Sequence, residues 1–158
     1  MAKIAMIGAG SLEFTRRLVQ GILNHASLRD SHIVLMDVDA ERLELVARVM
    51  EKMREQHGLA CSFSATTERR EALAGADFAV CTIMVGGLDA YRADVEIPLK
   101  HGVDVCVGDT LNPGGVFRGL RHVPALLDIA RDMEELCPGA LFLNHANPMA
   151  ICTWALRK

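Results

Sequence analysis

Short apolar runs alternate along this chain with longer segments in which apolar residues recur at helical spacing. The runs are rich in Ile and Val, which is typical of strands. This alternation predicts strand–helix–strand units and a parallel sheet with helices on both faces. The expected strands are residues 3–7, 32–36, 60–65, 78–84, 103–107 and 140–144.

The expected helices occupy the segments between these strands. Apolar stripes predict a helix after the first strand, a second around residues 43–53 and a short one over residues 68–74. Residues 88–101 are expected to be helical with an interruption near Pro98, and a further helix is expected to start near Pro124. A last helix begins at Met149.

The size of the chain predicts one compact domain over residues 1–158. These 158 residues, about half of them apolar, can bury one core but not two large ones. A net charge of −3 with no dense Lys/Arg run argues against nucleic acid or an anionic membrane as the main partner. No apolar run approaches the roughly 20 residues that cross a bilayer. We therefore expect a small-molecule ligand.

The cysteines indicate a reducing compartment. They are odd in number, widely spaced and mostly set in apolar runs, so we expect buried reduced thiols rather than disulfides. The N-terminus has no basic segment followed by a long apolar core, as a signal peptide would. Both observations predict a cytoplasmic protein. The cysteines are Cys61, Cys81, Cys106, Cys137 and Cys152.

A glycine turn follows the first expected strand. Gly8 and Gly10, with Ser11 and Leu12 opening the next helix, place backbone N–H groups and a helix N-terminus where a pyrophosphate can bind. Glu13 occupies the place of the third glycine in the usual dinucleotide fingerprint. The strand–turn–helix context predicts a Rossmann-type cofactor site, and a turn with no ligand is the alternative.

Asp37 follows the second expected strand directly. A carboxylate at this position can accept hydrogen bonds from the adenosine ribose hydroxyls and would repel a 2′-phosphate, which favours NAD over NADP. Arg42, one turn into the next helix, leaves NADP open. Alternatively, Asp37 or Asp39 serves as the N-cap of that helix.

Two glycine-rich loops follow later strands. Gly86 and Gly87 would let the backbone pass close to a cofactor, or they form only a flexible turn. The loop from Asp109 to Gly115 lies at the edge where doubly wound sheets bind ligands. Arg118 and Arg121 follow it and either meet an anion or are solvated surface residues.

The last expected strand ends in a segment that carries two asparagines. Pro148 restricts Asn147 toward extended geometry, so its amide would project toward the nicotinamide side of the site, unless it serves only the turn. Asn144 stands at the strand end and is a further candidate cofactor contact. His145 is expected to be a packed or surface histidine.

Taken with their order, these motifs resemble the NAD- and metal-dependent glycosidases of glycoside hydrolase family 4. The form Asp-Thr-Leu-x-Pro-Gly-Gly looks most like the α-galactosidase (melibiase) branch. The resemblance covers almost the whole chain. The motifs that carry it are 7–11 with Phe14, 35–39, 86–87, 97–102, 109–115 and 144–150.

The resemblance implies a three-layer doubly wound α/β domain that binds NAD. In the family, NAD takes the hydride from sugar C3, a divalent metal such as manganese polarises the ketone, and a tyrosine removes the C2 proton before elimination. It implies that Asn147 and Asp109 contact substrate. The family's metal ligands and base lie beyond the Asn-Pro-Met segment, and neither Cys152 nor Tyr91 matches them. We therefore expect the metal/catalytic domain to be absent and the isolated chain to be inactive.

Alternatives to this assignment remain open. A lactate- or malate-type dehydrogenase domain shares the strand pattern but predicts a pair of substrate arginines after the fourth strand, where only Arg92 is present. A non-catalytic NAD-sensing module is the other class. The glycone could be a galactoside, glucoside, galacturonide or phosphosugar, and an unphosphorylated hexoside is favoured. We expect an exposed apolar surface near Trp154 and Leu156 that invites homo-oligomer formation.

Overall fold

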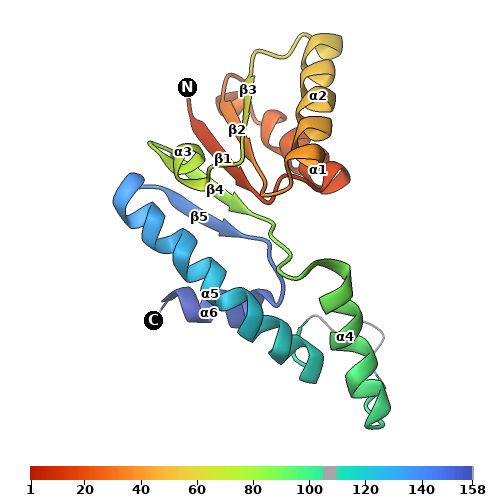
Figure 1. Ribbon diagram of the computed structural model, residues 1–158. Helices are drawn as coiled ribbons and strands as arrows, with labels where there is room; N and C mark the ends of the chain where they lie inside the picture. Colours follow the sequence, from red (N-terminus) through yellow and green to blue (C-terminus); the bar gives the residue numbers. More distant parts are fainter. Residues whose placement is uncertain (105–109, 158) are drawn as a thin grey trace. The chain divides into compact units, whose positions relative to one another are not determined.

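A computed structural model describes residues 1–104 and 110–157 of the chain (Figure 1). The chain divides into two compact units. The first unit comprises Met1–Thr82 and Asp132–Leu143, and the second comprises Ile83–Arg131 and Asn144–Lys158.

The first unit is built on a five-stranded sheet with the strand order β3-β2-β1-β4-β5. β1 pairs in parallel with both β2 and β4, and β2 pairs in parallel with β3. This order is that of a doubly wound Rossmann sheet and confirms the predicted fold class. The strands are β1 (Lys3–Ile7), β2 (His32–Met36), β3 (Ser62–Thr66), β4 (Phe78–Cys81) and β5 (Leu141–Asn144).

Helices α1 (Leu12–Leu23) and α2 (Ala40–His57) lie together against one face of this sheet (Figure 1). Their apolar stripes pack on alternate residues of the central strands, such as Ile4 and Leu35, to form one buried cluster. The intervening residues, Ala5 among them, are also fully buried. Burial on both faces explains why these strands are continuous apolar runs in the sequence.

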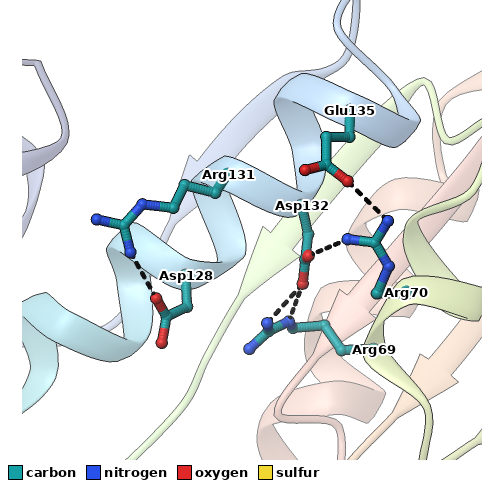
Figure 2. A network of polar contacts seen from close by, with 6 residues as sticks. All are labelled: Arg69, Arg70, Asp128, Arg131, Asp132 and Glu135. Carbon is teal, nitrogen blue, oxygen red and sulfur yellow. Dashed lines mark hydrogen bonds and ion pairs between the residues drawn. The ribbon is translucent and has the colours of Figure 1, made fainter.

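The short helix α3 (Arg69–Leu73) is held by ion pairs to the C-terminal end of α5 (Pro113–Leu136). Figure 2 shows Arg69 and Arg70 converging on Asp132, at 2.5 Å in each case, while Arg70 also reaches Glu135 at 2.8 Å. Burial raises the pKa of the Asp132 carboxyl, but hydrogen bonds from Arg69 and Arg70 outweigh this and hold it below its usual value. Asp132 is therefore an anionic anchor between these two elements.

The second unit consists of α4 (Gly87–Lys100), the N-terminal part of α5, and α6 (Met149–Arg157). The predicted interruption near Pro98 is wrong, because α4 runs through Pro98 to Lys100. Pro98 lies in the last turn, where it removes only the hydrogen bond to the Asp94 carbonyl. The backbone of Gly114 packs on that carbonyl instead, since a Cβ added at Gly114 would lie 2.0 Å from the Asp94 oxygen.

The predicted start of a helix near Pro124 is also wrong. α5 begins at Pro113, in the first turn where proline is well tolerated, and continues past Pro124. Side chains of Arg121 and His122 hydrogen-bond to the backbone of Val85, and Leu126 is buried. Tertiary contacts and burial on the two sides of Pro124 thus keep the helix intact where a local pattern predicted a boundary.

Three predicted strands differ from the structure. The strand expected at 60–65 is observed as β3 at Ser62–Thr66. β4 ends at Cys81 rather than at residue 84, because its neighbour β1 ends at Ile7 and turns away at Gly8. Of the strand expected at 103–107, residues 103 and 104 belong to no strand and the rest lies outside the described residues. The strand expected at 140–144 is observed as β5, next to β4 in the sheet order.

The described cysteines are all buried thiols outside disulfides, as expected, and Cys106 lies outside the described residues. Burial raises the pKa of the Cys61, Cys137 and Cys152 thiols, which keeps them neutral. Within residues 1–104 and 110–157, no helix is both long and apolar enough to cross a membrane.

Candidate cofactor-binding site

The glycine turn after β1 is tied to the end of β2. Gly8 has φ of 91°, a left-handed conformation that only glycine adopts without strain. The N–H groups of Gly8 and Ala9 both donate to the Met36 carbonyl, at 2.9 Å each. The turn is therefore fixed by backbone bonds at the carboxyl edge of the sheet, where doubly wound folds bind their ligands.

The same turn fixes the predicted ribose-binding carboxylate. Asp37 accepts a hydrogen bond from the Gly10 N–H at 2.7 Å and another from the Asp39 N–H at 3.0 Å. A Cβ added at Gly10 would lie only 2.7 Å from Asp37 Oδ2, so glycine is needed for this close approach. Asp37 is half-buried, and its oxygens keep lone pairs for further donors.

Two threonines that the sequence analysis did not single out support the turn from behind. Thr15, fully buried on α1, donates its hydroxyl to the Ala9 carbonyl at 2.9 Å. Thr82, just after β4, donates to the Gly8 carbonyl at the same distance. A polar residue on the otherwise apolar face of α1 was the available signal for Thr15, but no local pattern reveals which carbonyl it meets.

Ser11 and Leu12 lie at the start of α1, where the backbone N–H groups of the helix are exposed to a ligand. Ser11 is the N-cap, and its hydroxyl makes no capping bond within the described chain. The first N–H groups of an α-helix have no partner inside the helix, so this end can donate to an anion. Both residues are exposed, as a ligand-binding position requires.

Glu13, in the place of the third fingerprint glycine, is directed toward two arginines. Its carboxylate pairs with Arg17 at 2.6 Å and with Arg16 at 3.1 Å. Hydrogen bonds from Arg17 and then Arg16 hold the pKa of Glu13 below its usual value. The negative charge of Glu13 at the start of the helix is thus balanced by the two neighbouring arginines.

The role of helix N-cap falls to Asp39 rather than Asp37. Asp39 accepts from the Arg42 N–H at 3.1 Å and pairs with the Arg42 guanidinium at 3.2 Å. The alternative in which an aspartate caps α2 is therefore correct for Asp39, and Asp37 is left for another role. Arg42 is largely exposed and pairs with Asp39.

Gly86 and Gly87 lie in the second unit, where they open α4. Their φ values are 84° and 61°, so both positions require glycine. Gly86 is the N-cap of α4, and a Cβ there would lie 2.6 Å from the Ala90 side chain. The turn is therefore a closely packed one, which argues against the alternative of a merely flexible connection.

Asn144, the last residue of β5, and Asn147, which follows the strand, both make local hydrogen bonds. The Asn144 side-chain oxygen accepts from the Ala146 N–H at 3.0 Å. Its amide nitrogen donates to the Ala146 carbonyl at 3.3 Å and to the Thr153 hydroxyl at 3.4 Å. Asn147 accepts from the Met149 N–H at 3.4 Å and is joined to Pro148 by a cis peptide. The turn role considered for Asn147 is thus observed, and His145 is exposed.

Arg118 and Arg121 are not the solvated surface residues that the sequence allowed. Arg118 is 8% exposed and lies over the Tyr91 ring at 5.3 Å from its centroid. Arg121 makes a two-point contact with Asp94. Asp109, the other predicted substrate contact, lies outside the described residues. Nowhere in the described parts of the chain do three or more His, Cys, Asp or Glu side chains gather as metal ligands would.

Comparisons with known proteins agree with this geometry. The family model described as "Family 4 glycosyl hydrolase" matches residues 3–158. An alpha-galactosidase of Rhizobium meliloti (strain 1021) is 47% identical over 97% of this chain and 31% of its own length. An alpha-galactosidase of Bacillus subtilis (strain 168) is 38% identical over 100% of this chain and 37% of its own length.

A solved structure extends the likeness to three dimensions. A 6-phospho-alpha-glucosidase from gut microorganisms, in complex with NAD and Mn²⁺, superposes with a TM-score of 0.85 at 29% identity. The match covers 98% of this chain and 35% of that one, so the chain spans about a third of the length of its relatives. The family match favours the glycosidase resemblance over a lactate- or malate-type dehydrogenase. The chain belongs to the family 4 glycosyl hydrolases.

Proposed function

We propose that this chain binds NAD through the glycine turn after β1 and the carboxylate of Asp37. The observation that carries the proposal is the hydrogen bond from Gly10 N–H to Asp37, which fixes a carboxylate beside an open helix N-terminus. The turn and helix start suit a pyrophosphate, and Asp37 suits vicinal ribose hydroxyls. The NAD- and Mn²⁺-bound relative supports this assignment.

Within this site each residue has a separate task. Gly8 makes the turn, Gly10 allows and orients the Asp37 carboxylate, and Ser11 and Leu12 donate N–H groups to the diphosphate. Asp37 accepts from the ribose and, as an anion, disfavours a 2′-phosphate. Gly86, Gly87 and Asn144 remain predicted cofactor contacts, and Asn147 and Asp109 remain predicted substrate contacts.

We further propose that residues 1–158 form the cofactor-binding domain of a glycosidase for a small glycoside, with an unphosphorylated α-galactoside as the favoured substrate. The two alpha-galactosidases named above support this choice. NAD, when bound, supplies a reversible hydride acceptor for oxidation at sugar C3. Phosphosugar-specific members of the family use a basic residue after the double glycine, and Arg92, exposed on α4, lies one position off that pattern.

A manganese site does not fit the described residues, which offer no cluster of three metal-ligating side chains. Tyr91, the single tyrosine, lies beneath the Arg118 guanidinium and half-buried. We therefore assign no metal-dependent or tyrosine-dependent step to this chain. The proposal is that the isolated chain binds NAD without hydrolysing glycosides.

The cofactor assignment is tested by titrating the purified chain with NAD and NADP in a calorimeter. NAD should bind at least about tenfold more tightly than NADP, and Asp37→Ala should weaken NAD by about tenfold or more, as expected for lost hydrogen bonds to a charged group. Equal affinity for NAD and NADP would remove Asp37 from its role. Failure of the wild-type chain to bind NAD would refute the site as a whole.

Gly10→Ala tests whether the position of the Asp37 carboxylate matters, apart from its presence. The new Cβ would lie 2.7 Å from Asp37 Oδ2, so the flexible carboxylate must shift, and NAD affinity should fall about as far as in Asp37→Ala. Gly21→Ala on α1, the helix that follows the turn, is the control for adding a methyl group, because nothing lies within 4 Å of its added Cβ. Equal NAD affinity for the two alanine variants would contradict the proposal.

The activity proposal is tested by incubating the chain with NAD, Mn²⁺ and a chromogenic α-galactoside. No release of the chromophore is expected from the 158 residues alone. Turnover above background would show that the chain itself holds the missing groups.

A further inference from the structure

Two consecutive side chains of α5 hold both polar backbone groups of Val85, the residue directly before the Gly86–Gly87 turn. The Val85 N–H donates to His122 Nε2 at 3.1 Å. The Val85 carbonyl accepts from Arg121 Nε at 3.1 Å. A loop residue is thus fixed at both its donor and its acceptor by a neighbouring helix.

Arg121 is itself fixed by α4. Its two terminal nitrogens donate to Asp94, at 3.2 Å to Oδ1 and 2.5 Å to Oδ2. The Asp94 side chain is 4% exposed and that of Arg121 is 29% exposed, so this is a largely desolvated two-point ion pair. The guanidinium therefore joins the α4 helix, the α5 helix and the Val85 carbonyl in one rigid arrangement.

His122 is held in one tautomer. Its Nδ1 lies 2.8 Å from the Arg118 carbonyl, which can only accept, so Nδ1 carries the proton and Nε2 is the acceptor for Val85. The imidazole is fully buried. Burial lowers its pKa, and the charged groups around it are Arg118 and Arg121 on α5 and Asp94 on α4. A second proton on Nε2 would point at the Val85 N–H and break that bond.

The turn that follows has no space to relax around this arrangement. A Cβ at Gly86 would lie 2.6 Å from Ala90 and 3.2 Å from Arg121 Nε. Gly86 also holds a left-handed φ of 84°. The conformation of the turn thus depends on where Arg121 and His122 place Val85.

We propose that Arg121 and His122 are positioning residues that hold the Gly86–Gly87 turn in its cofactor-binding conformation, and that His122 does so only as the neutral imidazole. This inference rests on the proposed function, in which the turn contacts NAD. It adds a dependence on the protonation of a buried residue that does not itself touch the cofactor. Acid should therefore weaken NAD binding as His122 gains its second proton.

The test measures NAD affinity of the chain by calorimetry between pH 7.5 and pH 5. In the wild type, affinity should fall about threefold to tenfold with acid, the value of one lost hydrogen bond. His122→Gln keeps an acceptor for Val85 that does not titrate, so its affinity at pH 7.5 should stay near wild type and the fall should disappear. His122→Leu should be weakened about tenfold at pH 7.5. His57→Gln, at an exposed position on α2, is the control for histidine loss.

Arg121→Met tests the second contact, with Arg131→Met as the matched control on the same helix. Among the described residues, Arg131 pairs with Asp128 at an exposed position, so its loss should leave NAD affinity unchanged. Arg121→Met should weaken NAD about tenfold. A ¹⁵N spectrum of the wild type should show His122 as the neutral Nδ1–H tautomer at pH 7.5.

The outcomes separate the two proposals. If the wild type binds no NAD, the proposed function fails and this inference fails with it. If the wild type binds NAD but His122→Gln keeps the full acid dependence, or if Arg121→Met binds as well as Arg131→Met, the inference alone is wrong. A His122 that is doubly protonated at pH 7.5 would also overturn it.

Discussion

The interiors of the two units differ in chemistry. The first unit buries a continuous apolar cluster that includes Ile4, Leu35 and Met50. The second unit buries charged and polar groups, namely Asp94, Arg118 and His122, whose hydrogen bonds connect α4, α5 and the loop between β4 and α4. Apolar packing tolerates small adjustments, whereas a buried polar network has one satisfied arrangement. The second interior is therefore suited to fix a turn, and the first to supply stability.

The two units also differ in how many of their apolar side chains are exposed. In the second unit, Phe117 and Leu120 on α5 are 61% and 66% exposed, and Trp154 on α6 is 78% exposed. The exposure expected near Trp154 is thus confirmed, while Leu156 is half-buried. The helices of the first unit cover their sheet with most of their apolar side chains. Apolar side chains of the second unit remain open on its surface, and such patches favour association.

The largest expected effect probes the apolar interior of the first unit. Met50 is fully buried on α2, so Met50→Ala should lower the free energy of unfolding by about 2–5 kcal/mol through lost burial and a cavity. Leu45→Ala, on the same helix but 48% exposed, should change it by about 0.5 kcal/mol or less. Urea denaturation followed by circular dichroism measures both. Similar losses in the two variants would contradict the assigned core.

A slightly smaller effect is expected from the polar interior of the second unit. Asp94→Ala leaves the Arg121 guanidinium without its buried partner and should cost about 3 kcal/mol, the lower end for buried pairs because Arg121 keeps some exposure. Asp128→Ala removes an exposed partner on α5 and should cost less than about 1 kcal/mol. Urea denaturation followed by circular dichroism measures the loss of stability in both variants. A loss at Asp94 no greater than at Asp128 would mean that this interior contributes no stability.

Acid should act in turn on one buried titratable group of each unit, His122 in the second and Asp132 in the first. The pKa of His122 is lowered by burial, so the unfolded chain takes up its proton first, and stability present in full above about pH 6.5 falls as the pH drops below that value. The pKa of Asp132 is lowered in the folded state, so its contribution is present above pH 3.8 and is lost as the pH falls further. Stability measured against pH should lose the first step in His122→Gln and the second in Asp132→Asn.

The smallest expected effect concerns a helix start in the first unit. Asp39 caps α2 through the Arg42 N–H, so Asp39→Ala should cost about 1 kcal/mol and Asp39→Ser, which keeps a capping oxygen, should cost little. Thermal denaturation measures the difference between the two variants. Because Asp39 is not a proposed cofactor contact, NAD affinity should be unchanged in both, which distinguishes it from Asp37.

Much of the first unit was predicted from the sequence because its determinants are local. The strands at 3–7 and 32–36 are observed with the same bounds, since an apolar run and a following glycine or aspartate specify both ends. Gly8 and Asp37 were found for the same reason. The wrongly predicted helix boundaries fall at Pro98 and Pro124, where a local rule about proline is overridden by tertiary contacts.

The sequence by itself determined the alternation of strands and helices, the glycine turn, the acidic residue after β2 and the resemblance to family 4. These features depend on residue type and spacing along the chain. The tertiary structure alone decided that Thr15 and Thr82 support the turn, that Asp39 rather than Asp37 caps α2, and that Arg121 and His122 hold Val85. Such partners are distant in sequence, and a buried polar group has no pattern that names the atom with which it will bond.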